Sequence, residues 1–483
     1  MGSEELAGLD IPQSKQLLLK AAEISEELWE SSAKQAEDVV RLLGLHTLAL
    51  IQAGAYIANG HSRLDQYPEV FRRHRERLFK FRLNQAQSRY CDIYTTFEAS
   101  AHVLESSGSD AAKDALHLLK ILSMLNYSIL PLRIFEDAWH GSRDLSDADE
   151  AESVIDYLSQ WHVSQLPDFM VADSDEWDSY RLIEATSLLA SLSLIARYSS
   201  AGIFGLSMDP VVHAWARDRL GPDQQNQAWI ATGCIVALSA SAPYDTWIIQ
   251  QRHLRPQIQS FLDIKVKTAL SLGSVSVILP ILLECGWILY RIRDDSRLGK
   301  FLEDIYTELD VDPAKPSKEY IRVYSLDASN LINLGYPKKA VQLLEYVVKI
   351  EESVLPEDHS DRLTSQHQIA SAYQDNGQVV KAIQLLEHVI KIQELVLPED
   401  HSSRLTSQHE LARAYLANKQ VVQAIQLLEH VVKIEESLLL EDHSNLLASQ
   451  HQLARAYQAN GQLTKADELE RAMYTSFNNF GEQ

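Results

Sequence analysis

The sequence has few cysteines and an excess of acidic over basic residues. Cys91, Cys234 and Cys285 are its only cysteines in 483 residues, and they lie far apart. This spacing suggests neither a metal knuckle nor a disulfide framework, and it favours a reducing intracellular compartment. Forty-four basic against 67 acidic residues give a net charge of −23, which disfavours a nucleic-acid partner.

The sequence also lacks a secretory signal and a clear membrane span. Residues 1–5 (MGSEE) do not have the basic-then-apolar order of a signal peptide. The most apolar stretch, 268–290, has Glu284 as its only charged residue, but three serines and Pro280 interrupt it. A carboxyl group and a proline are both costly inside a membrane, so a buried helical hairpin is favoured over a spanning helix. We expect no membrane partner and a cytoplasmic location.

Two motifs of enzyme chemistry are missing. No G-x-x-x-x-G-K-[ST] loop occurs, since the only Gly-Lys pair, Gly299-Lys300, is followed by Phe301. Without that loop nothing cradles the phosphates of a nucleotide. No G-x-S-x-G nucleophile elbow occurs either. The sequence therefore predicts a protein that is not an enzyme and has no cofactor.

What the sequence does contain is an internal repeat of 42 residues in its last third. Asp-His-Ser recurs at 358–360, 400–402 and 442–444, in register with Ser-Gln-His at 365–367, 407–409 and 449–451. Each copy holds two amphipathic stretches, broken near 376–377, 418–419 and 460–461, where Lys419 replaces an expected glycine. Such a unit is a helical hairpin that buries its apolar face only by stacking on its neighbours.

Small residues recur where the two helices of each hairpin must approach closely. They are Ala370, Ala412 and Ala454 in the first helices and Ala382, Ala424 and Ala466 in the second, with a weaker earlier copy around 331–344. The pattern resembles the tetratricopeptide repeat (TPR), and its length resembles that of kinesin-light-chain repeats. The resemblance implies an α-solenoid with a groove that binds proteins.

The front half shows helical patterns and one hairpin signal. Helices are expected at 17–29, 36–50, 64–81, 111–125 and 211–220, with a small β-hairpin around the turn at 199–202. Helices closed by a hairpin are typical of a winged-helix fold.

Two segments of the front half resemble the NB-ARC/TPR receptors of NLR type found widely in fungi. Residues 43–50 (LGLHTLAL) resemble the GLPLAL segment of the helical ARC subdomain, and 204–216 (FGLSMDPVVHAWA) resemble the winged-helix segment that ends in the Met-His-Asp motif. In that family a proline touches the adenine and a histidine meets the ADP phosphate; His46 and Asp209 stand at those places here. The resemblance implies the C-terminal part of such a receptor, without the P-loop nucleotide-binding core.

These patterns predict a mainly all-α protein in four parts. A helical ARC-like domain spans 1–105, and a winged-helix-like domain with a small β-hairpin spans 106–222. Degenerate helical hairpins and a linker fill 223–316, and a TPR solenoid of about four 42-residue repeats fills 317–483.

The repeated Asp-His pairs allow a metal or acid–base interpretation. Consecutive pairs lie a whole repeat apart, too far to share one ion, and Asp or Ser immediately before a helix is a common N-cap. Capping is therefore favoured, and we expect no metal site.

The first helix of each repeat is expected to line the concave side of the solenoid. Counting from the aligned tyrosines at 373, 415 and 457 places three histidines in a row there, with two arginines one turn along. These donors could hold an acidic or C-terminal peptide. The alternative is that they are solvent-facing residues copied by repeat duplication. The candidate partner-binding residues are His367, His409, His451, Arg413, Arg455, Gln374 and Gln458.

The sequence thus favours a non-catalytic, NLR-related scaffold or signalling adaptor that binds a protein or peptide in its TPR groove. A kinesin-light-chain-like cargo adaptor stays open, although the front of the chain lacks a heptad coiled coil. An accessory protein or enzyme of a biosynthetic pathway also stays open, and would need a buried polar pocket.

Overall fold

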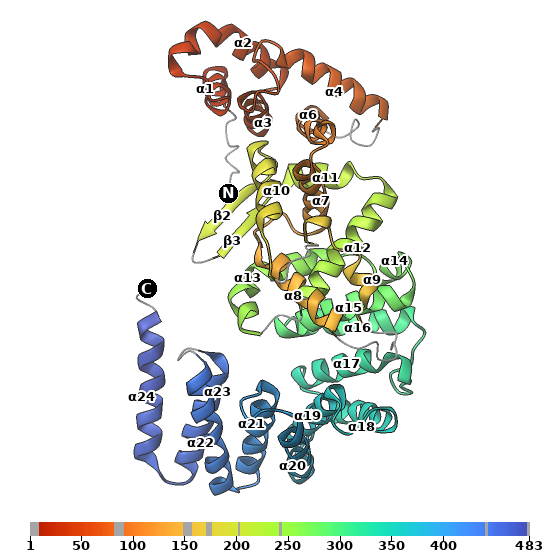
Figure 1. The fold of residues 1–483 in the computed structure, drawn as a ribbon, viewed down its shortest axis with the longest axis vertical. Coiled ribbons are helices and arrows are strands. Elements are labelled where there is room, and N and C mark those ends of the chain that lie inside the picture. Colours follow the sequence, from red (N-terminus) through yellow and green to blue (C-terminus); the bar gives the residue numbers. More distant parts are fainter. Residues whose placement is uncertain are drawn as a thin grey trace, which may run out of the picture. The chain divides into compact units, whose positions relative to one another are not determined.

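The computed structural model of the chain describes residues 9–81, 91–147, 157–170, 176–200, 203–240, 244–439 and 443–480. These residues are mainly helical, so the predicted all-α class is confirmed. They divide into two units at Ile288 and Leu289, within helix α15 (Val275–Arg291). Figure 1 labels most of the helices and two of the strands. The four-part domain division stays a prediction.

The first helices are shorter than the sequence predicts. Glu23 (φ 53°) follows α1, and Leu45 (φ 58°) follows α2; both have left-handed backbone, which a continuing helix cannot contain. The helices predicted at 17–29 and 36–50 are therefore wrong, because each bridges one of these breaks. The observed helices are α1 (Ile11–Ala21), α2 (Trp29–Leu42), α3 (Thr47–Ala58), α4 (Tyr67–Phe81) and α6 (Cys91–Ser107).

A small antiparallel sheet follows, in the order β1-β3-β2. The predicted hairpin is present, with Ala196 opposite Ser207 and Ser200 opposite Ile203. Gly205 lets β1 approach β3, because a Cβ there would lie 2.8 Å from the Leu130 carbonyl oxygen. The elements of this part are α7 (Asp110–Met124), β1 (Leu130–Pro131), α8 (Arg133–Asp147), α9 (Gln160–Val163), α10 (Tyr180–Ser191), β2 (Ala196–Ser200), β3 (Ile203–Ser207) and α11 (Pro210–Asp218).

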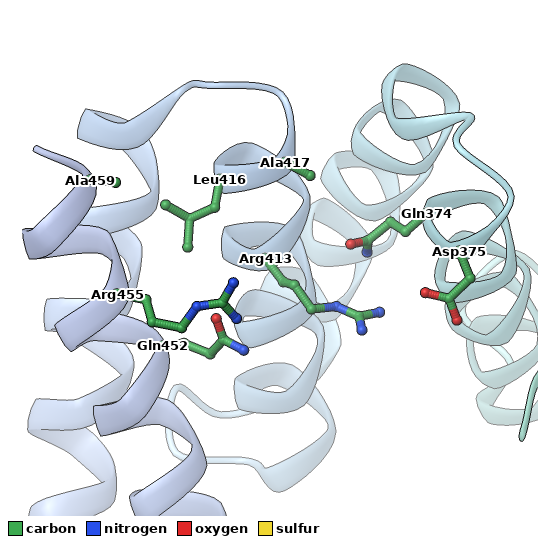
Figure 2. A pocket seen from close by; sticks show the side chains of 8 residues that line it. All are labelled: Gln374, Asp375, Arg413, Leu416, Ala417, Gln452, Arg455 and Ala459. Atoms are coloured by element: carbon green, nitrogen blue, oxygen red, sulfur yellow. The ribbon is translucent and has the colours of Figure 1, made fainter.

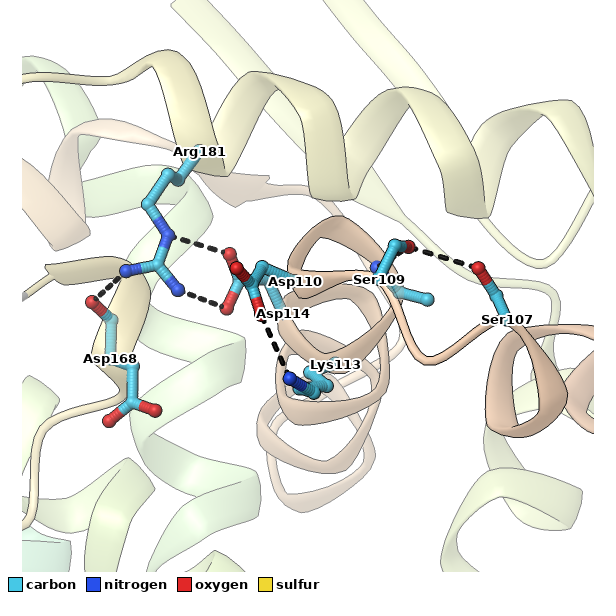
Figure 3. A network of polar contacts seen from close by, with 8 residues as sticks. Ser107, Ser109, Asp110, Lys113, Asp114, Asp168 and Arg181 are labelled. Carbon is cyan, nitrogen blue, oxygen red and sulfur yellow. Dashed lines mark hydrogen bonds and ion pairs between the residues drawn. The ribbon is translucent and has the colours of Figure 1, made fainter.

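One arginine connects α10 to α7 and to a 3₁₀ turn (Figure 3). Arg181 of α10 donates from Nε and Nη2 to the two carboxylate oxygens of Asp114 in α7, both at 2.8 Å. Its Nη1 donates at 2.7 Å to the backbone carbonyl of Asp168, which begins a 3₁₀ turn. Because Asp114 is only 2% exposed, this bidentate pair fixes the angle between α7 and α10.

The apolar stretch 268–290 covers the end of α14 and most of α15. Leu279, Leu283 and Ile288 of α15 are fully buried. Gly233 lets α12 approach Ile281 of α15 closely, since a Cβ at position 233 would lie 2.7 Å from Ile281 Cγ2. In the described part of the chain, no helix combines the length and apolar content needed to cross a membrane. The three helices that precede α15 in the sequence are α12 (Pro222–Ser239), α13 (Tyr244–Phe261) and α14 (Val266–Leu270).

The second unit contains the repeats as stacked helical hairpins. From α17 to α24 each helix packs on the next one along the chain. The six alanines predicted at the helix crossings, at 370, 382, 412, 424, 454 and 466, are fully buried. The helices are α16 (Asp295–Glu308), α17 (Ile321–Asn333), α18 (Pro337–Val354), α19 (Ser360–Asp375), α20 (Val379–Val396), α21 (Ser402–Ala417), α22 (Val421–Leu438), α23 (Ser444–Ala459) and α24 (Leu463–Phe480).

The turn between the two helices of each hairpin needs one residue with left-handed backbone, that is, with a positive φ. Gly335 (φ 80°), Gly377 (φ 77°) and Gly461 (φ 75°) supply it in three copies. Lys419 adopts the same conformation (φ 63°) in the remaining copy, at a cost of about 1 kcal/mol. The array therefore keeps its turn geometry even where the sequence departs from glycine.

Candidate functional site

Two of the three histidines predicted to form a row of donors contact a serine hydroxyl of the next repeat. Half-buried His367 has its Nδ1 3.5 Å from the Ser407 hydroxyl, and half-buried His409 has its Nδ1 3.1 Å from the Ser449 hydroxyl. Burial lowers the pKa of His367 and of His409, so both imidazoles are neutral near pH 7. His451, in the last repeat, is exposed.

Arg413 of α21 is half-buried and already has partners. Its Nη2 lies 2.6 Å from Glu410 Oε2, one turn earlier in the same helix, and donates to the Ser371 hydroxyl of α19 at 3.2 Å. Gln374 donates to the Glu410 backbone carbonyl at 3.3 Å. The charge of Arg413 is therefore compensated within the array, and its position is fixed from two helices.

A hollow of about 450 Å³ lies on the face formed by α19, α21 and α23 (Figure 2). Arg455 of α23 is exposed there and makes no hydrogen bond or ion pair with the residues that the structure describes. The Nε of Arg413 and the Oε1 of Gln452 are buried without a hydrogen-bond partner within those same ranges. The hollow is lined by Gln374, Asp375, Arg413, Leu416, Ala417, Gln452, Arg455 and Ala459.

The two ends of this hollow carry opposite charges. Asp375, the last residue of α19, is exposed and has no ion-pair partner among the described side chains. Arg455 occupies the opposite side of the hollow, and Figure 2 shows Arg413 between them. Because Glu410 compensates Arg413, the uncompensated charges are one carboxylate on α19 and one guanidinium on α23.

These charges arise where the repeats differ from one another. The corresponding positions 371, 413 and 455 hold Ser, Arg and Arg, while 375, 417 and 459 hold Asp, Ala and Ala. Positions 374, 416 and 458 hold Gln, Leu and Gln. Copying of one repeat accounts for residues that are identical in all copies, but it does not account for these differences.

The structure gathers three of the seven predicted residues, Gln374, Arg413 and Arg455, at one hollow. Gln458 does not line it and donates to Glu470 Oε1 at 2.8 Å, and the three histidines do not line it either. That the seven residues bind a partner stays a prediction. Sequence reasoning missed Gln452 and the compensating Glu410. The signal for Glu410 was its spacing of three residues from Arg413, which places the two side chains together on a helix.

The repeated Asp-His pairs mark helix starts, but the capping residue is histidine. The Nδ1 atoms of His359, His401 and His443 accept hydrogen bonds from the backbone N–H two residues later, at 3.2, 3.2 and 3.1 Å. The expectation that Asp or Ser provides the cap is therefore wrong, although capping itself is confirmed. Asp442 lies outside the described residues. Over the described ranges, no three acidic, histidine or cysteine side chains are grouped so that they could hold a metal ion.

One of the two departures from the receptor motifs, Asp209, has a local role in the first unit. Asp209 is the N-cap of α11, and its Oδ1 accepts a hydrogen bond from the Val211 backbone N–H at 2.7 Å. His46 precedes α3 and makes no side-chain capping hydrogen bond. A helix-starting role is sufficient to explain Asp209.

The repeats that carry the hollow match a known family. The sequence profile of the tetratricopeptide repeat matches residues 361–437 and 403–475, which include all eight residues that line the hollow. The hairpins from α19 onward are therefore TPR hairpins. No curated protein matches the chain.

Several solved structures are similar to part of the chain. Two are of nearly identical TPR-like repeats from a Podosopora anserina protein described as a kinesin light chain. One is 39% identical and covers 42% of this chain and 95% of that chain, with a TM-score of 0.36. The other is 41% identical and covers 40% and 92%, with a TM-score of 0.34. A third is Bacillus thuringiensis PlcR in complex with the peptide PapR7 and DNA, at 12% identity, covering 53% and 86%, with a TM-score of 0.35.

Proposed function

We propose that this chain is a non-catalytic interaction scaffold that holds a partner protein or peptide in the hollow of its TPR array. The supporting observation is the exposed Arg455, which has no hydrogen-bond or ion-pair partner among the described residues. Beside it, the Nε of Arg413 and the Oε1 of Gln452 are buried and unpaired over the same ranges. Buried polar atoms without partners are costly, so a ligand that pairs with them is favoured. A carboxylate is the best partner for a guanidinium group.

A finer proposal makes the protein a cytoplasmic, NLR-related signalling adaptor. It rests on the resemblance of 43–50 and 204–216 to the receptor motifs. The element order α7, β1, α8, α10, β2, β3 supports a winged-helix-like domain within 106–222, because helices there are closed by a hairpin. A bound nucleotide is no part of this proposal, because the sequence has no phosphate loop and Asp209 caps a helix. A cargo adaptor and an accessory protein of a biosynthetic pathway remain the alternatives.

Affinity capture from native extract tests the scaffold and separates these classes. The bait is the full chain, compared with Arg455→Ser, which introduces the residue found at position 371. The matched control is Lys391→Ala with Lys433→Ala, since both lysines are exposed on the second helices of their repeats. We expect a set of proteins that Arg455→Ser loses and the control keeps.

The identity of the captured proteins then distinguishes the proposals. Signalling partners support the adaptor, a motor heavy chain supports cargo binding, and pathway enzymes support the accessory role. Equal capture by the wild type and by Arg455→Ser would show that the hollow is not the binding site.

A further inference from the structure

We propose that the hollow recognises a bipolar peptide segment, with a carboxylate for Arg455, an apolar side chain for Leu416 and a cation for Asp375. The inference rests on the proposed function and names the ligand class of the same site. It differs from the purely acidic ligand that the histidines and arginines predict from the sequence.

The distribution of charge favours a bipolar over an acidic ligand. Arg413 is compensated by Glu410 at 2.6 Å, so it adds little net positive charge. Arg455 and Asp375 are both exposed and have no ion-pair partners among the described residues. A purely acidic ligand would gain the attraction of Arg455 but would meet the repulsion of Asp375. A ligand with both charges gains at both ends.

The helix arrangement sets the distance between the two charges of the ligand. Asp375 lies on α19 and Arg455 on α23, with α21 between them, and adjacent first helices are in contact. Neighbouring helix axes are about 8–10 Å apart, so the ends of the hollow are separated by two such steps. An extended chain spans about 3.3–3.6 Å per residue, so the acidic and basic residues of the ligand lie about four to six positions apart.

The middle of the hollow presents an apolar side chain, whereas its two ends present charged ones. Leu416 lines it where the corresponding positions, Gln374 and Gln458, carry amides. Leu416 is half-buried against the cores of two repeats, so its remaining surface is available to an apolar side chain. The three consecutive repeats therefore present an acidic, an apolar and a basic position in turn, and one direction of the ligand along the array is favoured over the other.

A display library of random linear peptides, each about twelve residues long, tests this inference with the full-length chain as bait. We expect the selected peptides to share an acidic and a basic residue about four to six positions apart, with an apolar residue between them. The variants are Asp375→Ala, the residue found at 417 and 459, and Arg455→Ser, the residue found at 371. Each places a residue that the same fold already accepts at that position, and circular dichroism verifies that helicity is kept.

Each variant should remove the preference for one of the two charged residues of the peptide. Asp375→Ala should weaken binding of a selected peptide about tenfold. It should leave the affinity unchanged for a version of that peptide whose basic residue is alanine. Arg455→Ser should give the mirror result with the acidic residue. Acidic peptides that bind wild type and Asp375→Ala equally well, yet depend on Arg455, would overturn the bipolar ligand and leave the scaffold in place. Peptides indifferent to both variants, or a selection without enrichment, would overturn both proposals.

Discussion

The Ser365 hydroxyl donates a hydrogen bond at 2.9 Å to the carboxyl group of Glu351, and so joins the second helix of one repeat to the first helix of the next. Glu351 is only 3% exposed, and its other oxygen has no hydrogen-bond partner among the described residues. Burial raises the pKa of Glu351 to about 7, and the bond from Ser365 opposes this only in part. One repeat later, Gln393 occupies the corresponding position.

Glu351→Gln should stabilise the array at high pH. A carboxyl group whose pKa is raised in the folded state favours folding below its ordinary pKa of 4.5, and this contribution is lost as the pH rises through about 7. The glutamine variant should therefore gain up to about 3 kcal/mol at pH 8 and much less near pH 5. Urea unfolding at both pH values measures the difference. Glu352→Gln, at an exposed position, is the control, and an equal gain at both pH values would contradict the argument.

The histidine caps should contribute to stability in each repeat. His401→Ala removes the acceptor for the Ser403 backbone N–H, so the free energy of unfolding should fall by about 1 kcal/mol. His401→Asn should restore most of the loss, because asparagine is a strong N-cap. Thermal unfolding measures both variants, with Lys433→Ala as the control. A loss of equal size in the asparagine variant would assign the effect to something other than capping.

Replacing Lys419, which has left-handed backbone, should stabilise the array, whereas removing a histidine cap destabilises it. Lys419→Gly should raise the free energy of unfolding by about 1 kcal/mol, because glycine adopts φ 63° without strain. Gly377→Ala, at the corresponding turn, should lower it by a similar amount. Chemical denaturation of the two variants compares them directly. If Lys419→Gly is destabilising, the backbone strain assigned to this turn is absent.

The sequence predicted the repeats well because their packing is periodic: Ala370 and Ala382 must be small wherever the two helices cross, and the spacing reveals both. It predicted the hollow only in part. Arg413 was counted as a free donor, although its charge is compensated by Glu410. The break after α1 was missed because Glu23 adopts left-handed backbone, which no composition rule anticipates for glutamate. The break after α2 did have a signal in the sequence, because Gly44 (φ 62°) precedes Leu45 and glycine commonly ends a helix.

Partner affinity should depend on the two arginines of the hollow and not on cations elsewhere in the array. Arg413→Ala with Arg455→Ala should weaken binding of a captured partner by at least about tenfold, whereas Lys391→Ala with Lys433→Ala should have little effect. Added salt should also weaken the interaction, because Arg455 is exposed. Isothermal calorimetry measures all three. Equal losses in both double variants would place the site outside the hollow.

Affinity should change little between about pH 7.5 and 6, although binding would tighten over this range if the predicted row of histidines gained charge and met the ligand. Burial lowers the pKa of His367 and of His409, so both take up a proton only at more acidic pH than an ordinary histidine. The exposed His451 is changed to Gln to remove its contribution. Calorimetry across this range checks the prediction. A severalfold tighter complex at the lower pH in that background would show that the two buried imidazoles do take part.

The 42-residue repeat fixes the distance between equivalent positions in successive hairpins of the array. The uncompensated acid and base of the hollow belong to different repeats, and the number of hairpins between them sets their separation. Duplicating the middle hairpin would leave every nearest-neighbour contact intact and would move Asp375 and Arg455 apart by one more helix spacing. If the hollow binds the bipolar segment proposed above, gain or loss of a whole repeat would therefore change the spacing of the two charges that it selects, while the chemistry at the two ends stays the same.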